Sequence, residues 1–194
     1  MKRLVAILTI IGALIAAAIA WGDHPIEFGQ TTQPPSVSCP ANCQAVGQVT
    51  GFEVQQGTSK NPFTRRRRGK VVAFSVTLGK PKASDITFFN KLFGSPPQAQ
   101  LAVLKPGYVV ALTVPTWAPA FAVNLGNDEA WRSSRDPQHC DDVQQKAAQV
   151  TRGQLASYQC LYRTARLMYT ATFIPDPRVT TPTQTTPKKK TGSG

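Results

Sequence analysis

Histidine is scarce in this sequence, and the motifs of common hydrolases and nucleotide-binding enzymes are absent. The 194 residues contain two histidines, His24 and His139, but no nucleophile elbow, H-E-x-x-H zinc motif or phosphate-binding loop. A general base at His139 needs a serine or free cysteine held against it, and its neighbours Asp136, Gln138 and Asp141 form a polar loop. We therefore expect a protein that is not an enzyme and uses no cofactor. A hydrolase acting through His139 is the catalytic alternative.

Acidic residues are also few. The chain has 10 Asp and Glu against 22 Lys and Arg, a formal net charge of +12. The acidic pairs Asp128-Glu129 and Asp141-Asp142 lack the alternating Asp-x-Asp spacing of calcium loops, so we expect no metal site. A positive field of this size attracts anionic surfaces, although it also serves solubility alone.

The first twenty residues have the three parts of a secretory signal peptide. Lys2 and Arg3 precede an uncharged apolar run over residues 4–19, which closes on the small residues of Ala18-Ile19-Ala20. We expect cleavage before Trp21 and a protein that is secreted or held at the extracytoplasmic cell surface. If the segment is not cleaved, it is long enough to anchor the protein in the membrane with the rest exported. In both cases we expect no nucleic acid as a physiological partner.

Four cysteines are present, namely Cys39, Cys43, Cys140 and Cys160. An even number in an exported chain predicts two disulfides. The spacing favours Cys39 with Cys43 and Cys140 with Cys160, although the sequence permits three pairings. A zinc site is the alternative, but thiolates in an oxidising compartment usually pair with each other.

Hydrophobic residues between positions 39 and 175 recur mostly at every second position, which is typical of half-buried strands. The stretch Lys70–Leu78 has the clearest pattern, with Val72, Phe74, Val76 and Leu78 on one face. Further strands are expected at Tyr108–Val114, Ala120–Leu125 and Leu167–Phe173, with weaker ones at Val46–Val54, Ala99–Leu104 and Tyr158–Tyr162. About seven short strands separated by turns predict an all-β fold, an antiparallel β-sandwich or jelly roll.

One segment departs from this period. A two-turn helix at one end of the sandwich is predicted between Ser84, as its N-cap, and Gly94, which ends it. Asp85 lies in its first turn, and its apolar residues recur at helical spacing. A further helical turn is expected at Gln144–Gln149, and a tight turn at Lys105-Pro106-Gly107.

These patterns divide the chain into four parts: a signal peptide (1–20), an extended linker (21–38), the β-sandwich domain (39–175) and a disordered tail (176–194). The tail consists mainly of Thr, Pro and Lys, a composition that cannot bury enough apolar surface to order itself. Its run Lys188-Lys189-Lys190 suits an electrostatic tether to an anionic surface, and a solvated end without function is the alternative.

Two clusters are candidates for binding. The first consists of Arg65, Arg66, Arg67 and Arg68, which directly precede the best strand. Guanidinium groups suit phosphate and carboxylate ligands, while charges at a strand edge also prevent aggregation. The second, weaker patch consists of Trp131, Arg132 and Arg135. A tryptophan in such a sandwich more often anchors its loop to the core, and an exposed tryptophan that forms a carbohydrate platform is the alternative.

Four segments resemble a set of uncharacterised exported bacterial β-sandwich proteins of unknown function: Gly69–Gly79, Val109–Pro119, Ala130–Arg132 and Tyr162–Leu167. The resemblance covers most of residues 39–175 and implies a β-sandwich, but no activity. Such proteins carry a longer excursion where this chain has only Lys105-Pro106-Gly107. The resemblance therefore implies that this chain lacks a strand or pairs its strands differently.

We accordingly expect a secreted or cell-surface, non-catalytic module that binds an anionic glycan, a cell-wall polymer or an anionic membrane surface. The main alternative is a structural or assembly protein of the cell envelope that binds another protein. A large exposed apolar patch on one face of the sandwich would indicate this alternative.

Overall fold

The structure is a computed structural model that describes residues 24–65, 67–105, 108–143 and 155–177. Within it, His24–Pro175 forms one unit. The signal peptide (1–20), the helical turn at Gln144–Gln149 and the lysine run of the tail lie outside the described residues. No helix in the described ranges is both long enough and apolar enough to cross a membrane.

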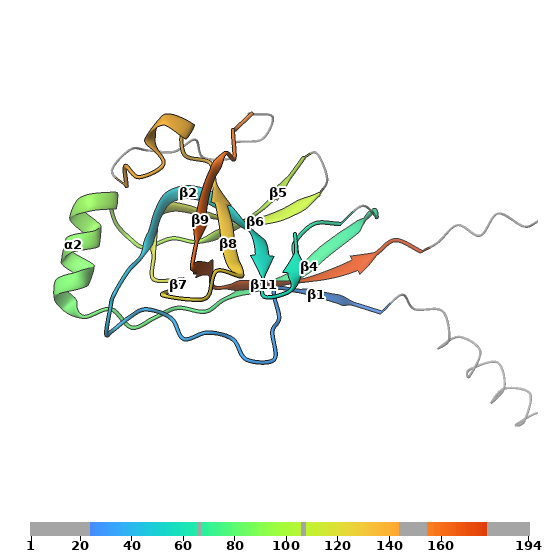
Figure 1. The fold of residues 1–194 in the computed structure, drawn as a ribbon, viewed down its shortest axis with the longest axis horizontal. Helices are drawn as coiled ribbons and strands as arrows, with labels where there is room; N and C mark the ends of the chain where they lie inside the picture. The colour runs from blue at the N-terminus through green and yellow to red at the C-terminus, as the bar shows by residue number, and fades with distance from the viewer. Residues whose placement is uncertain (1–23, 66, 106–107, 144–154, 178–194) are drawn as a thin grey trace, which may run out of the picture. The chain divides into compact units, whose positions relative to one another are not determined.

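The described part of the chain is mostly β-structure with one α-helix (Figure 1), as the sequence predicts. The strands are β1 (Ile26–Phe28), β2 (Val46–Gln56), β3 (Ser59–Lys60), β4 (Gly69–Val76), β5 (Gln100–Leu104), β6 (Val109–Ala118), β7 (Phe121–Val123), β8 (Glu129–Ser133), β9 (Cys160–Arg163), β10 (Ala165–Leu167) and β11 (Tyr169–Pro175). They outnumber the seven expected because several are short. One of them, β1, lies in the segment expected to be a linker, where it pairs with β11.

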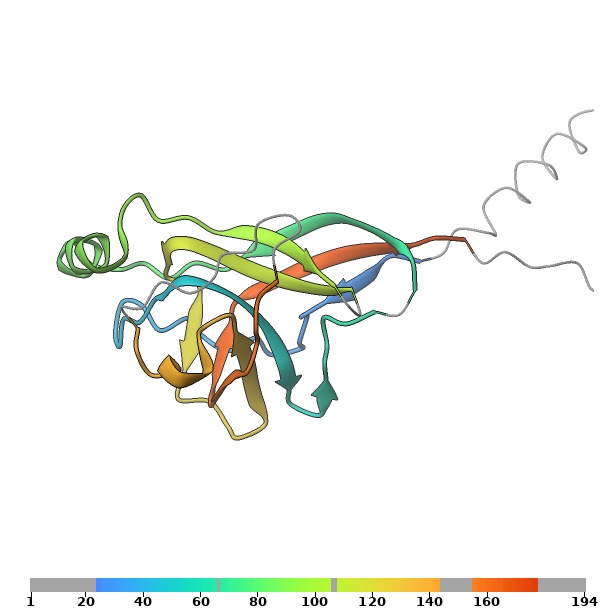
Figure 2. The same cartoon turned by 90° about the horizontal axis from the view of Figure 1, so that it is seen from above.

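The strands form three antiparallel sheets. One has the order β1-β11-β4, a second pairs β10 with β7, and the third has the order β5-β6-β2-β8-β9 with β3 added to β2. Strands β4 and β5 are therefore terminal strands of two different sheets. Figure 2 shows the same unit from above.

The core lies between the sheets and is rich in aromatic rings. Phe28 and Phe63 are fully buried, and the rings of Phe63 and Tyr169 stack with centroids 4.3 Å apart. Phe28 also stacks on Phe173 of β11, at 5.6 Å. Burial of each such ring contributes about 1.5–3 kcal/mol of transfer free energy. These contacts join β1 and the segment before β4 to the last strand of the chain.

Helix α2 (Ala83–Phe93) lies at one end of the unit (Figure 1). It begins after Lys82, not after Ser84 as the sequence suggested, because the Asp85 carboxylate accepts a hydrogen bond from the Lys82 amide at 2.9 Å. On the inner side, Phe89 and Phe93 are buried against Trp117. The indole Nε1 of Trp117 donates to Oδ1 of Asn90 at 2.9 Å, which fixes the helix on β6.

Candidate functional site

The arginine run does not form one uniform cationic patch. The guanidinium of Arg65 lies 5.0 Å from the ring centroid of the buried Phe28, and its backbone amide donates to the Tyr108 carbonyl at 3.4 Å. Arg66 lies outside the described residues, Arg67 is half-buried and Arg68 is exposed. Arg65 thus helps to hold the fold, and among the three described arginines of the run Arg68 is the exposed one.

The second expected patch is not formed on the surface. Trp131 is 5% exposed, stacks on Tyr162 with centroids 4.6 Å apart and meets Phe121 edge-on. A Cβ atom at Gly51 of β2 would stand 2.8 Å from the indole ring, so only glycine leaves room for Trp131 there. This is the anchoring role that the sequence favours for the tryptophan. Since Tyr162 stacks on the indole and so little of it is exposed, it offers no platform for a sugar ring.

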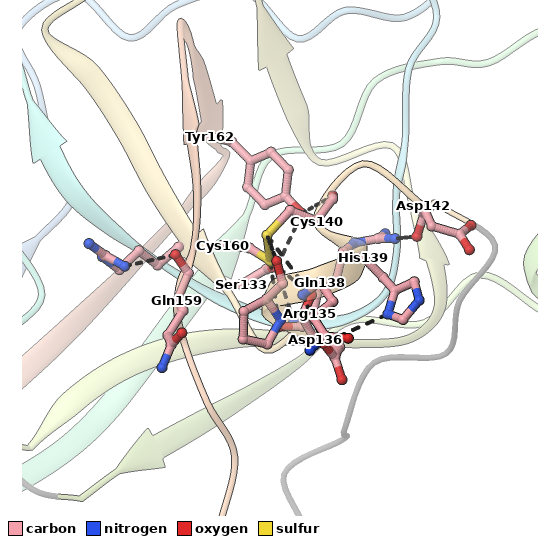
Figure 3. Close-up of a disulfide and its surroundings, with 12 residues drawn as sticks. Ser133, Arg135, Asp136, Gln138, His139, Cys140, Asp142, Gln159, Cys160 and Tyr162 are labelled. Atoms are coloured by element: carbon pink, nitrogen blue, oxygen red, sulfur yellow. Dashed lines mark hydrogen bonds and ion pairs between the residues drawn. A yellow bond between two sulfur atoms is a disulfide. The ribbon is translucent and has the colours of Figure 1, made fainter.

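The two arginines of that patch also bond to the backbone. Arg132 donates to the carbonyls of Tyr158 and Gln159, each at 3.0 Å. Arg135 is buried and donates to the carbonyls of Gly47 and Asp142. A groove of about 230 Å³ is lined by residues that include Trp131, Arg135 and Tyr162. The guanidinium of Arg135 in this groove already donates to two backbone carbonyls. These residues stabilise the loop around the second disulfide (Figure 3).

All four cysteines are paired as the spacing favours, Cys39 with Cys43 and Cys140 with Cys160. They are therefore not available as thiolate ligands for zinc. Such disulfides are typical of oxidising, extracytoplasmic compartments. His139, beside the second disulfide, is exposed in the short 3-10 helix Pro137–His139 with Nδ1 3.7 Å from Asp136 (Figure 3). That the protein is not an enzyme stays a prediction.

A cluster of buried charged groups was not anticipated from the sequence. Glu129 and Arg166 form a buried ion pair, with Nε of Arg166 2.8 Å from the carboxylate, and Nη1 of Arg166 donates to Thr31. Glu53 of β2 is fully buried next to this pair, and burial raises the pKa of its carboxyl well above the usual value. The sequence does contain one indication that Glu53 is buried. The alternation of side chains along β2 puts Glu53 on the same face as the apolar Val49.

Exposed apolar side chains, among them Phe74, Leu78 and Val103, lie on or next to the terminal strands of two sheets. In the described part of the chain, no strand pairs with the outer edge of β4 or with that of β5. The two strands run in opposite directions. At one end, Leu78 and Gly79 share a groove with Gln98 and Ala99; at the other, the Arg65 amide bonds to Tyr108. Unpaired edges offer backbone groups to another chain.

Apolar side chains on the core-facing side of both edge strands are only partly covered. Phe74 lies opposite the buried Ala171, and Val103 lies opposite the buried Val110, so both occupy the inner face of their sheets. Yet Phe74 is 49% exposed and Val103 is 54% exposed. We call the region between the edges the β4–β5 seam; its inner-face residues are Phe74, Val76, Leu101 and Val103.

The seam continues into an apolar groove of about 280 Å³ next to helix α2. Leu78, Ile86, Pro97 and Trp117 are among its lining residues, and Leu78 and Ile86 are exposed. The sequence pattern predicted β4 correctly, but a bulge opposite Thr172–Phe173 puts Val71 in place of Val72 across from Phe173. The apolar face of this strand is thus shifted at its start and uncovered in its middle.

Exposed basic side chains lie at both ends of the seam. Arg68, Lys70 and Lys105 are at the end where β4 begins, and Lys80 and Lys82 follow the other end of β4. Asp85 accepts a hydrogen bond from the Lys82 amide at one end, and Asp176 follows the residue that pairs with Gly69 at the other. The basic residues outnumber these acidic ones at each end. The seam therefore combines an apolar floor with positive ends.

The comparisons with known proteins found no matching family model, no matching curated protein and no matching solved structure.

Proposed function

We propose that this chain is an exported, non-catalytic binding module that binds another protein of the cell envelope through the β4–β5 seam. The observation that carries the proposal is the half-exposure of Phe74 and Val103 on the inner faces of two edge strands, whose outer edges pair with no strand in the described part of the chain. A soluble domain gains transfer free energy by covering such side chains, so exposed apolar surface at this place indicates a partner. Both disulfides support a location outside the cytoplasm.

Site-specific photo-crosslinking in the native host tests this proposal. A photoreactive phenylalanine analogue is placed at position 74 or 103 of the full chain, and at Phe88 as control. Phe88 is 59% exposed but lies on helix α2, outside the seam. We expect positions 74 and 103 to yield the same protein adduct and position 88 to yield none. Equal adducts at all three positions, or none at 74 and 103, would contradict the proposal.

Binding of an anionic polymer remains the second candidate, and the exposure of Arg68 and Lys70 favours it. Both precede or begin β4 and are open to a phosphate or carboxylate. Retention on an immobilised polyanion should weaken steeply with salt and fall when both are changed to serine. Arg163, an exposed arginine on β9, provides the control. If Arg163→Ser lowers retention equally, the binding reflects only the net charge of the protein and not a site at Arg68 and Lys70.

A further inference from the structure

We propose that the partner contributes an extended, acidic-ended β-strand that adds to the free edge of β4. This inference rests on the protein-binding function proposed above and specifies the chemistry of the partner. Strand addition combines main-chain hydrogen bonds along an edge with pockets for alternate side chains. The β4–β5 seam offers both.

The backbone of β4 is oriented for such pairing. The Thr77 amide donates to the Met168 carbonyl at 2.8 Å, so it points towards β11. Amide and carbonyl groups alternate between the two sides of an antiparallel strand. Those of Phe74 and Val76 therefore point away from β11, towards the free edge. The side-chain hydroxyls of Ser75 and Thr170 meet at 2.8 Å on the outer face, so the side chains of the neighbouring Phe74 and Val76 lie on the inner face.

The side chains define what the added strand must carry. Phe74 and Val76 of β4 and Leu101 and Val103 of β5 all lie on the inner face, as their buried cross-strand partners show. An incoming strand covers them only if every second residue is apolar. Eight residues of β4 correspond to about 26 Å at roughly 3.3 Å per residue, the length of an ordinary strand.

Charge selects the ends of the added strand. Arg68 and Lys70 lie at one end of β4, and Lys80 and Lys82 at the other, all exposed. A segment with acidic residues before and after its apolar alternation places opposite charges at both ends. A second copy of this chain is less suitable, because pairing two β4 strands brings together two copies in which basic residues far outnumber acidic ones.

A synthetic peptide tests the binding mode with the full exported chain. The probe has two glutamates, seven residues alternating valine and threonine, and two further glutamates. We expect it to slow amide hydrogen exchange at Phe74 and Val76 and to bind at least tenfold more tightly than a peptide with lysines in place of the glutamates. A proline in place of the second valine should abolish protection, because it removes a backbone donor and cannot continue the ladder.

Matched protein variants locate the effect. Phe74→Ser and Val103→Ser should each weaken peptide binding at least fivefold, whereas Phe88→Ser should leave it unchanged. Failure of the acidic peptide to protect the two amides, or equal binding of the proline peptide, overturns strand addition. If the crosslinks from positions 74 and 103 persist in that case, protein binding stands and only its mode is wrong. Protection of the same amides in a concentration-dependent dimer without peptide assigns the seam to a second copy and also overturns the proposal.

Discussion

The carboxylate Oε1 of Glu53 accepts a hydrogen bond of 2.6 Å from the backbone amide of Leu167. The bond joins β2 of the largest sheet to β10 of the smallest one. Its acceptor is fully buried, and desolvation by burial is the main cause of the raised pKa of Glu53; the Leu167 amide and Arg166 oppose it. The buried ion pair between Glu129 of β8 and Arg166 of β10 joins the same two sheets, so polar contacts at two buried places connect them.

The raised pKa makes the stability of the fold depend on pH. Above about pH 4.5 the unfolded chain releases a proton that folded Glu53 retains, so the free energy of unfolding falls as pH rises towards the folded pKa. The slope contributed by one proton is at most about 1.4 kcal/mol per pH unit. Glu53→Gln should remove this decline in denaturant unfolding between pH 4.5 and 8. Asp128→Asn, at an exposed carboxylate, is the control, and equal slopes in both variants would refute the assignment.

The ion pair of Glu129 and Arg166 should matter far more than a surface pair. Replacing Arg166 by Met leaves the buried Glu129 carboxylate without its cation, which costs about 3–5 kcal/mol. Arg163→Met, at an exposed site on β9, should cost less than about 1 kcal/mol. Urea unfolding at pH 7 measures both. Similar losses for the two variants would mean that the buried pair has no special role.

The sequence predicted elements better than it predicted their surroundings. Strand β4 and helix α2 were located because their apolar residues repeat with the period of each structure. Coverage of an apolar face, however, depends on strands that are distant in sequence. The pattern therefore puts Phe74 on the apolar face of its strand but does not show that this side chain is half-exposed. Burial of Trp131 agrees with the anchoring interpretation from the sequence, but its partners Tyr162 and Phe121 are distant in sequence and were not predicted.

Charged residues were the least predictable part of the candidate site. The local sequence indicated that Arg65 and Arg135 are surface groups. In the structure, the guanidinium of Arg65 lies over the Phe28 ring, and that of Arg135 donates to a backbone carbonyl. Cysteine pairing was predictable because short loops close more readily than long ones. No comparable rule assigns a partner to an arginine.

The two disulfides should differ in their contribution to stability. Cys140 and Cys160 are 20 residues apart and Cys39 and Cys43 are four apart. The loop-entropy relation gives about 3.3 kcal/mol for the first and about 2 kcal/mol for the second. Thermal unfolding of the two double-serine variants should therefore rank the Cys140–Cys160 variant as less stable. The reverse ranking would show that the small ring contributes through its contact with the chain at Gly79.

Docking of helix α2 should depend on the side-chain hydrogen bond between Trp117 and Asn90, although Gln48 of β2 also donates to the Phe93 carbonyl at the end of the helix. Asn90→Ala leaves the indole Nε1 of the buried Trp117 without an acceptor, which costs about 1–3 kcal/mol. Tryptophan fluorescence in a denaturant titration reports the loss. Lys91→Ala, at the next and exposed position, should leave the midpoint unchanged. An unchanged midpoint for Asn90→Ala would mean that ring packing of Phe89 and Phe93 holds the helix without this bond.

The free edges of β4 and β5 also affect how the protein behaves at high concentration. Unpaired strands with apolar side chains favour association between identical chains, and mutual repulsion of molecules that each carry +12 charges opposes it. Dissolved salt shortens the range of that repulsion to about 10 Å at 0.1 M. Concentrated stocks of the partner-free protein are therefore colloidally most stable in dilute buffer, and added salt promotes clustering.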